Sequence, residues 1–100
     1  MARANFQISP EAKAVLLDML RGFKARFGKD VVPAIMLVDP ALNPGLPPEI
    51  TIGFFDDRAE IEDVIQTIGD LEVVLAVSDQ DLALFEGKTL DYEEDRFVTK

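Results

Sequence analysis

Hydrophobic residues recur every three or four positions between residues 10 and 27, which is the spacing of one buried helix face. Ser9 precedes this segment in the N-cap position, Pro10 occupies the first helical position, and Gly28 follows as a left-handed C-cap. The pattern therefore predicts an amphipathic helix between these caps. The positions expected to be buried are Ala12, Val15, Leu16, Met19, Leu20, Phe23 and Phe27.

Three later segments have the composition of buried strands. Val31–Val38 is rich in Val and Ile, Ile50–Phe55 alternates between two faces, and Leu71–Val77 is heavy in Val and Leu. Residues 6–8 predict a further short strand before the helix. Because proline cannot donate a backbone hydrogen bond, Pro33 predicts that the first of these three strands starts at a sheet edge or a bulge.

The second half of the chain predicts a shorter helix and a terminal hairpin. Asp57 has the position of a helix cap, and an apolar stripe follows it in residues 58–68. Beyond the last long strand, we expect a hairpin of two strands at Leu82–Phe85 and Thr89–Tyr92. Phe97 and Val98 predict a last short pairing.

This order of elements predicts one domain that spans residues 1–100. The chain contains no internal repeat and no segment with the composition of a linker. The later strands lie too close together in sequence for helical crossovers, so we expect them to pair antiparallel. The predicted fold class is therefore α+β, with a mainly antiparallel sheet, one N-terminal helix and one short second helix.

The absence of two residue types excludes many functions. The 100 residues contain no Cys and no His. Thiolate-bound iron–sulfur clusters, zinc fingers and Ser-His-Asp triads are therefore excluded, and we expect no cofactor and no enzymatic activity. The longest apolar run, Val31–Val38, is far shorter than the roughly 20 residues that cross a membrane. We expect a cytoplasmic protein without a membrane partner.

Charge narrows the range of partners. The net charge is −9, and it is unevenly divided, because residues 1–50 sum to +1 and residues 51–100 sum to −10. So acidic a chain repels phosphate backbones, and we expect no nucleic acid as a partner. A protein partner is compatible with this charge, and a cationic protein would be attracted to the acidic second half.

A proline-rich segment between two predicted strands is the first candidate binding site. Residues 39–49 contain four prolines, which cannot form a helix or the centre of a sheet. A stiff loop of this length is either a surface connection or a binding loop. The candidate binding residues at its centre, which include an expected Asn-Pro-Gly turn, are Leu42, Asn43, Pro44, Gly45 and Leu46.

Acidic residues offer a second candidate. Asp79 and Asp81 lie two positions apart, so they share one side of an extended segment and could contact a cation. A carboxylate-based metal site or enzyme would need a third group from Asp91, Glu93 or Glu94. The alternative is a solvated turn, because no complete calcium-loop motif surrounds the pair. No residue of the chain is assigned as catalytic or as an established metal ligand.

Basic residues gather at the end of the predicted N-terminal helix and form a third candidate. Cations complement the negative end of the helix dipole, which accounts for part of this cluster. The alternative is a site for a small anion or an acidic partner. The cluster consists of Arg21, Lys24, Arg26 and Lys29.

Residues 71–92 resemble the C-terminal part of the HesB-like, A-type iron–sulfur cluster carriers. That family has an apolar strand, a polar turn, an aromatic-bearing strand, a glycine and a Leu/Ile-Asp-Tyr/Phe motif. The corresponding segments here are Leu71–Val77, Ser78–Asp81, Leu82–Phe85, Gly87 and Leu90-Asp91-Tyr92. Ile8-Ser9-Pro10 at the entrance to an amphipathic helix, and Phe97 near the end, also resemble the family.

The resemblance implies a HesB-like, mostly β pseudobarrel with an N-terminal helix. It implies no iron–sulfur site, because the three cysteines of the family have no counterpart in this chain. The expected function is a non-catalytic, cysteine-free relative of these carriers that binds a protein or a small ligand. The alternatives are an acidic adaptor for a cationic protein and the carboxylate-based site described above. The oligomeric state is left open.

Overall fold

The computed structural model of the chain describes residues 4–38 and 49–100. In chain order the elements are β1 (Gln7–Ile8), α1 (Pro10–Phe27), β2 (Val32–Leu37), β3 (Ile50–Phe55), α2 (Arg58–Ile61), the 3₁₀ helix η2 (Glu62–Val64), β4 (Ile65–Ile68), β5 (Leu71–Leu75), the 3₁₀ helix η3 (Asp79–Leu84), β6 (Thr89–Glu93) and β7 (Arg96–Thr99). None of the helices in these two ranges has the length and apolar character needed to cross a membrane.

The strands form two mixed sheets, which confirms the α+β class. The larger sheet has the order β3-β2-β5-β4 and the smaller has the order β1-β6-β7. Three pairings are antiparallel, but β2 with β5 and β1 with β6 are parallel. A long connection through β3, α2 and β4 makes the first parallel pairing geometrically accessible. Among the described strands the two sheets stay separate and do not close into a barrel.

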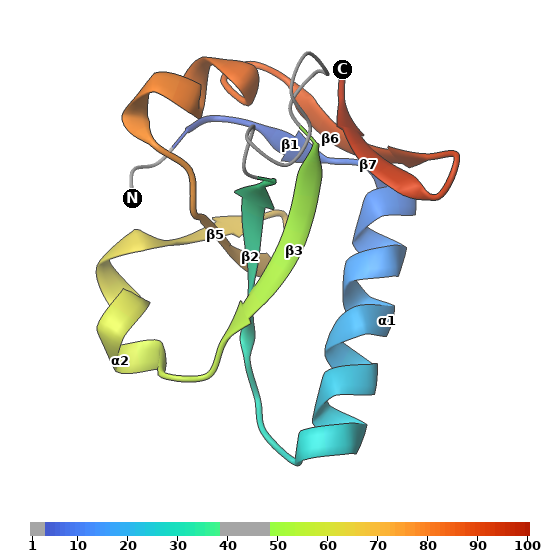
Figure 1. The fold of residues 1–100 in the computed structure, drawn as a ribbon, viewed down its shortest axis with the longest axis vertical. Coiled ribbons are helices and arrows are strands. Elements are labelled where there is room, and N and C mark those ends of the chain that lie inside the picture. The colour runs from blue at the N-terminus through green and yellow to red at the C-terminus, as the bar shows by residue number, and fades with distance from the viewer. Residues whose placement is uncertain (1–3, 39–48) are drawn as a thin grey trace.

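Helix α1 begins and ends at the predicted caps. The Ser9 hydroxyl accepts a hydrogen bond from the Ala12 amide at 3.1 Å, and Gly28 has a φ of 68°. The fully buried side chains of α1 lie in its N-terminal half, whereas the sheets cover its C-terminal half only in part (Figure 1). Met19 and Phe27, which were expected to be buried, are therefore 39% and 55% exposed. The periodic pattern continues past the point where the sheets can cover it.

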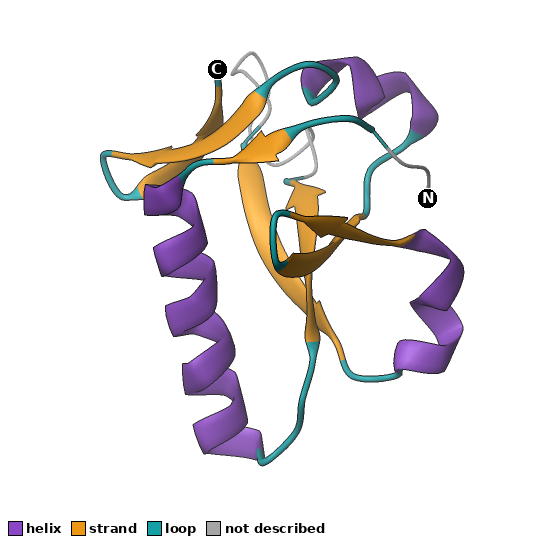
Figure 2. Ribbon diagram, turned by 180° about the vertical axis from the view of Figure 1, so that it is seen from behind, coloured by secondary structure: helices purple, strands orange, loops and turns teal. Residues whose placement is uncertain are grey.

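Apolar side chains from both sheets and α1 meet in one core. The opposite face of the larger sheet packs on α2 and its 3₁₀ extension, as the view from behind makes clear (Figure 2). The largest fully buried side chains are those of Phe85, Leu16, Ile35, Leu75, Leu90, Val73, Val74 and Pro33.

Strand β2 is central in the larger sheet, but Pro33 precedes its pairing with β5, so the start of the strand has an open edge on that side, as predicted. The Val38 amide donates to the Glu49 carbonyl at 2.8 Å, and this bond sets the alternation of the β2–β3 ladder. Pro33 faces Phe54 at a position where that ladder needs no amide, and pairing with β5 begins only at Ala34. The missing N–H therefore costs no hydrogen bond.

The predicted second helix is mostly wrong beyond its first turn. Asp57 accepts a hydrogen bond from the Ala59 amide and caps α2, but the α-helix ends at Ile61. Residues 65–68 instead form β4, which pairs with β5 in a hairpin turned at Gly69 and Asp70. The short apolar stripe is compatible with either a helix or a strand. Residues 65–68 form a strand because β5 lies alongside and pairs with them.

The predicted hairpin of Leu82–Phe85 with Thr89–Tyr92 is also wrong. Residues 82–84 belong to η3, and Phe85 is its C-cap. At the start of η3, the Ser78 hydroxyl donates a hydrogen bond to Asp81 at 2.9 Å. The terminal hairpin is formed by β6 and β7, which confirms the expected pairing at Phe97 and Val98. Glu94 and Asp95 make its turn with φ of 51° and 64°, the signs that a tight hairpin turn requires.

Replacing Leu16 with alanine should lower the free energy of unfolding by about 2–5 kcal/mol, because its fully buried side chain leaves a cavity between α1 and the sheets. Leu17→Ala is the matched control one position along the same helix. Leu17 is 36% exposed, and its loss should cost less than about 1 kcal/mol. Urea unfolding of both variants measures the difference, and equal losses would contradict the assigned helix orientation.

Candidate functional site

The proline-rich candidate loop lies outside the described residues. Leu42, Asn43, Pro44, Gly45 and Leu46 all fall in the segment 39–48, and their role stays a prediction. The residues on either side are described. Val38 and Glu49 are joined by the backbone hydrogen bond that ends the β2–β3 ladder. The two residues that flank the segment are therefore adjacent in the structure.

Asp79 and Asp81 lie on η3 and are not joined by the other candidate carboxylates. Asp81 accepts the Ser78 hydroxyl, and Asp91 is engaged at the N-terminus of α1. Within residues 4–38 and 49–100, no three acidic side chains gather in a way that could hold a metal ion. The geometry thus offers no support for combining the pair with Asp91, Glu93 or Glu94.

Asp91 instead ties the N-terminus of α1 to the terminal hairpin. Its carboxylate accepts the Ser9 hydroxyl at 2.7 Å and the Tyr92 amide at 2.8 Å, and Lys100 lies 3.1 Å away. These contacts, the Ser9 hydrogen bond first, lower the pKa of Asp91 from 3.8 to about 2. The Asp91 side chain is only 18% exposed, although three further acidic residues follow it within four positions. Asp91 and Glu93 lie two positions apart on β6 and share one face of the strand, and Lys100 pairs with both.

The basic cluster proves to line a groove beside the C-terminal half of α1. The segment that follows the helix turns back along it toward β2 (Figure 2). The hollow between them has a volume of about 410 Å³. We call it the α1 groove. Its apolar floor is formed by Leu17, Leu20 and Val31, and its mainly basic rim is formed by Arg21, Lys24, Lys29 and Asp30.

Each basic residue of the α1 groove has an acidic neighbour. Arg21 lies 2.9 Å from Asp18, Lys24 lies 3.0 Å from Asp30, and Lys29 lies 3.5 Å from Asp56. All six side chains are more than half exposed. Exposed pairs of this kind contribute about 0–1 kcal/mol each, so a ligand carboxylate can compete for the cations.

Arg26, the remaining member of the cluster, does not reach the groove. Its guanidinium lies 5.6 Å from the centre of the Phe27 ring. The sequence located the cluster, but it could not show which of the four cations share a hollow with apolar side chains. That depends on where residues 29–31 pass, which is a property of the tertiary structure.

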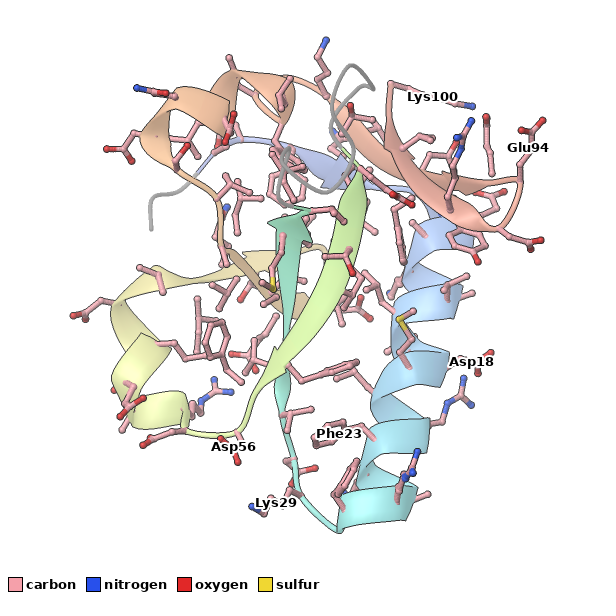
Figure 3. The ribbon with its side chains drawn as sticks, viewed as in Figure 1. Asp18, Phe23, Lys29, Asp56, Glu94 and Lys100 are labelled. Atoms are coloured by element: carbon pink, nitrogen blue, oxygen red, sulfur yellow. The ribbon has the colours of Figure 1, made fainter. Side chains whose placement is uncertain are left out.

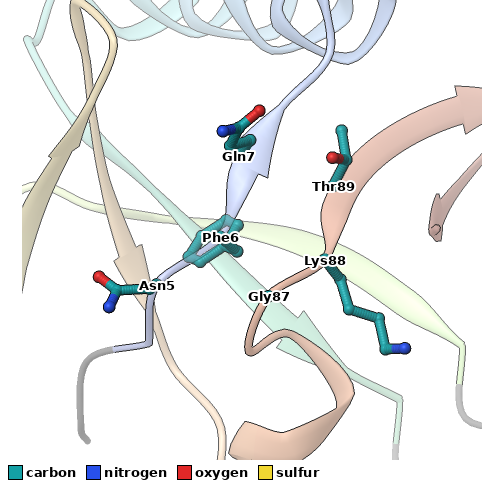
Figure 4. A pocket seen from close by; sticks show the side chains of 6 residues that line it. All are labelled: Asn5, Phe6, Gln7, Gly87, Lys88 and Thr89. Atoms are coloured by element: carbon teal, nitrogen blue, oxygen red, sulfur yellow. The ribbon is translucent and has the colours of Figure 1, made fainter.

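A second hollow, of about 500 Å³, lies where β1 meets β6 (Figure 4). Backbone groups that line this hollow are already hydrogen-bonded to each other, since the Gln7 amide donates to the Lys88 carbonyl at 2.9 Å. The Phe6 ring belongs to the core and meets Phe85 edge-on, with ring centres 5.9 Å apart. The α1 groove has the more distinct chemistry, because it combines an apolar floor with three cations.

No protein-family model, no curated protein and no solved structure matches this chain.

Replacing Asp91 with asparagine should destabilise the protein in a pH-dependent manner. The folded-state pKa lies below the ordinary value, so the charged carboxylate stabilises the fold above pH 3.8, and this contribution is lost as the pH falls toward 2. The difference in unfolding midpoint between wild type and Asp91→Asn should therefore be largest near about pH 6 and shrink below about pH 4.

Urea unfolding between these pH values measures the effect. Ser9→Ala should bring the pKa of Asp91 closer to its ordinary value, because the Ser9 hydroxyl is the largest cause of the lowered pKa. The pH range over which stability depends on Asp91 should therefore become narrower in this variant. A difference between wild type and Asp91→Asn that stays constant down to pH 2 would show that the charge of Asp91 does not contribute to stability.

Proposed function

We propose that this chain is a non-catalytic binding module for a protein or a small ligand and that the α1 groove is its binding site. The observation that carries the proposal is the combination of exposed apolar side chains with cations in one hollow. Leu17 is 36% exposed on the helix, and Lys24 lies two turns farther along the same side. A binding site needs such apolar surface together with a few polar groups that orient the ligand.

The chemistry of the groove favours a ligand with an apolar body and one acidic group. Burying the apolar body would cover Leu17, Leu20 and Val31, and the acidic group would meet the rim cations. The groove lies at the end of the molecule where Lys29 is found, whereas the acidic hairpin with Glu94 lies at the opposite end (Figure 3). The acidic side chains of the hairpin should therefore repel a ligand in the groove only weakly, because solvent screens charges that are more than about 10 Å apart.

We further propose that the fold is a divergent HesB-like pseudobarrel without the cluster chemistry of that family. The common core of the two sheets and α1, and the contact between β3 and β7, support this assignment. The net charge supports a protein or small-molecule partner rather than a nucleic acid. We also propose that the protein is located in the cytoplasm.

Titration with 4-phenylbutyrate should shift the NMR signals of the Leu17 and Leu20 methyl groups, and the neutral amide of the same compound should bind more weakly. An acetylated, amidated peptide of two leucines between two glutamates tests whether a protein segment fits better than a free carboxylate. Arg21→Gln combined with Lys24→Gln should weaken binding by up to about fivefold for each cation removed, because an exposed ion pair with the ligand contributes at most about 1 kcal/mol.

Lys88→Gln is the matched control for the loss of a surface cation, because Lys88 lies outside the α1 groove. It should leave both titrations unchanged. Shifts that spread evenly over the protein, or equal binding of the carboxylate and its amide, would overturn the assignment of the groove.

A further inference from the structure

The outer edge of β3 has no partner strand among residues 4–38 and 49–100. Strand β3 is at the end of the larger sheet, where β2 is its only partner in the described part of the chain. Because the Val38–Glu49 bond sets the alternation of the ladder, Ile50, Ile52 and Phe54 direct their amide and carbonyl groups away from β2. No backbone hydrogen bond from another described residue reaches these groups.

Nothing in the sequence of this strand protects its edge. Residues 50–55 read Ile-Thr-Ile-Gly-Phe-Phe and contain no charge and no proline. Natural proteins usually guard exposed edges with such residues, with bulges or with a covering element. β7 contacts β3, yet no hydrogen bond joins the two strands. In Figure 1 β3 passes in front of β2, and no described element passes in front of its lower half.

Aromatic side chains extend from this edge to the surface. The ring of Phe54 lies 5.0 Å from that of Phe23, which in turn lies 4.6 Å from Phe27. Phe23 projects from α1 toward β3 (Figure 3), and the Phe27 residue at the end of the row is 55% exposed. A strand added beside β3 would place alternate side chains on the α1 side of the sheet, where apolar ones would cover these rings.

Charges at both ends of β3 indicate which partner fits. Glu49 precedes the strand and Asp56 and Asp57 follow it, and all three are exposed. An extended segment with basic residues at its ends would be attracted at both ends. A second copy would bring the same acidic residues and a further net charge of −9, so charge favours a different protein.

We propose that β3 is a strand-addition site for an extended, apolar segment of a partner protein that carries Lys or Arg at both ends. Backbone hydrogen bonds to Ile52 and Phe54 would supply the affinity, and the row of aromatic rings would select apolar side chains. The site adjoins the α1 groove through the Lys29–Asp56 ion pair, but it does not depend on the function proposed for that groove.

A synthetic peptide of alternating valine and threonine, with two lysines at each end, tests the proposal. At saturation it should slow hydrogen exchange of the Ile52 and Phe54 amides at least tenfold, as NMR can measure residue by residue. The same peptide N-methylated along the edge that would face β3 should give no protection, because it cannot donate the backbone hydrogen bonds. A peptide with glutamates in place of the lysines should bind at least threefold more weakly.

Two pairs of variants separate the contribution of the acidic residues at the ends of β3 from that of the aromatic rings. Glu49→Gln with Asp56→Asn should weaken binding at least threefold, whereas Glu94→Gln with Asp95→Asn removes the same number of charges from the distant hairpin and should not. Phe27→Ser should weaken binding at least fivefold. Leu84→Ser, which removes another exposed apolar side chain, should leave binding unchanged.

Three outcomes would overturn the proposal. Exchange at Ile52 and Phe54 that stays fast with bound peptide would remove the edge as the site. Peptide shifts confined to Leu17 and Leu20 would assign the peptide to the α1 groove. A concentration-dependent dimer of the protein alone, detected by analytical ultracentrifugation and dissociated by the peptide, would make a second copy the occupant.

Discussion

The burial of apolar side chains between the two sheets is the interaction on which the rest of this fold depends. Among the described strands, no backbone hydrogen bond joins the smaller sheet to the larger one. Leu90 of the smaller sheet, Ile35 of the larger sheet and Leu16 of α1 are all fully buried in the same cluster. With no ladder between the sheets, this non-directional burial is the main force that holds them in one domain.

The surfaces proposed for binding lie where this core ends. Helix α1 is longer than the sheet surface it can cover, so it exposes Leu17 and Phe27 and forms a groove with the segment that leads to β2. The edge of β3 is open because the two sheets approach without hydrogen bonding. Both features lie beyond the part of α1 that contributes fully buried side chains, which are those of Ala12 and Leu16.

Polar contacts refine this arrangement. The N-cap residue Ser9 both accepts the Ala12 amide and donates to Asp91 on β6. One hydroxyl thus satisfies an unpaired donor at the start of the helix and connects the helix to the smaller sheet. Lys100 brings the last residue of the chain to the same carboxylate. The orientation of α1 relative to β6 is therefore defined by directional bonds as well as by packing.

The sequence by itself determined α1 with its caps, the strands β2, β3 and β5, and the basic cluster at the end of α1. These features depend on local periodicity, capping residues and charge, which are all properties of neighbouring positions. Tertiary structure decided the secondary structure of the short apolar segments, because residues 65–68 and 82–85 are each compatible with more than one local pattern. The first became a strand through its pairing with β5, and the second became part of a 3₁₀ helix closed by Ser78 and Asp81. It also decided that β3 is an edge and that three cations share a groove, since both depend on which distant segments lie alongside.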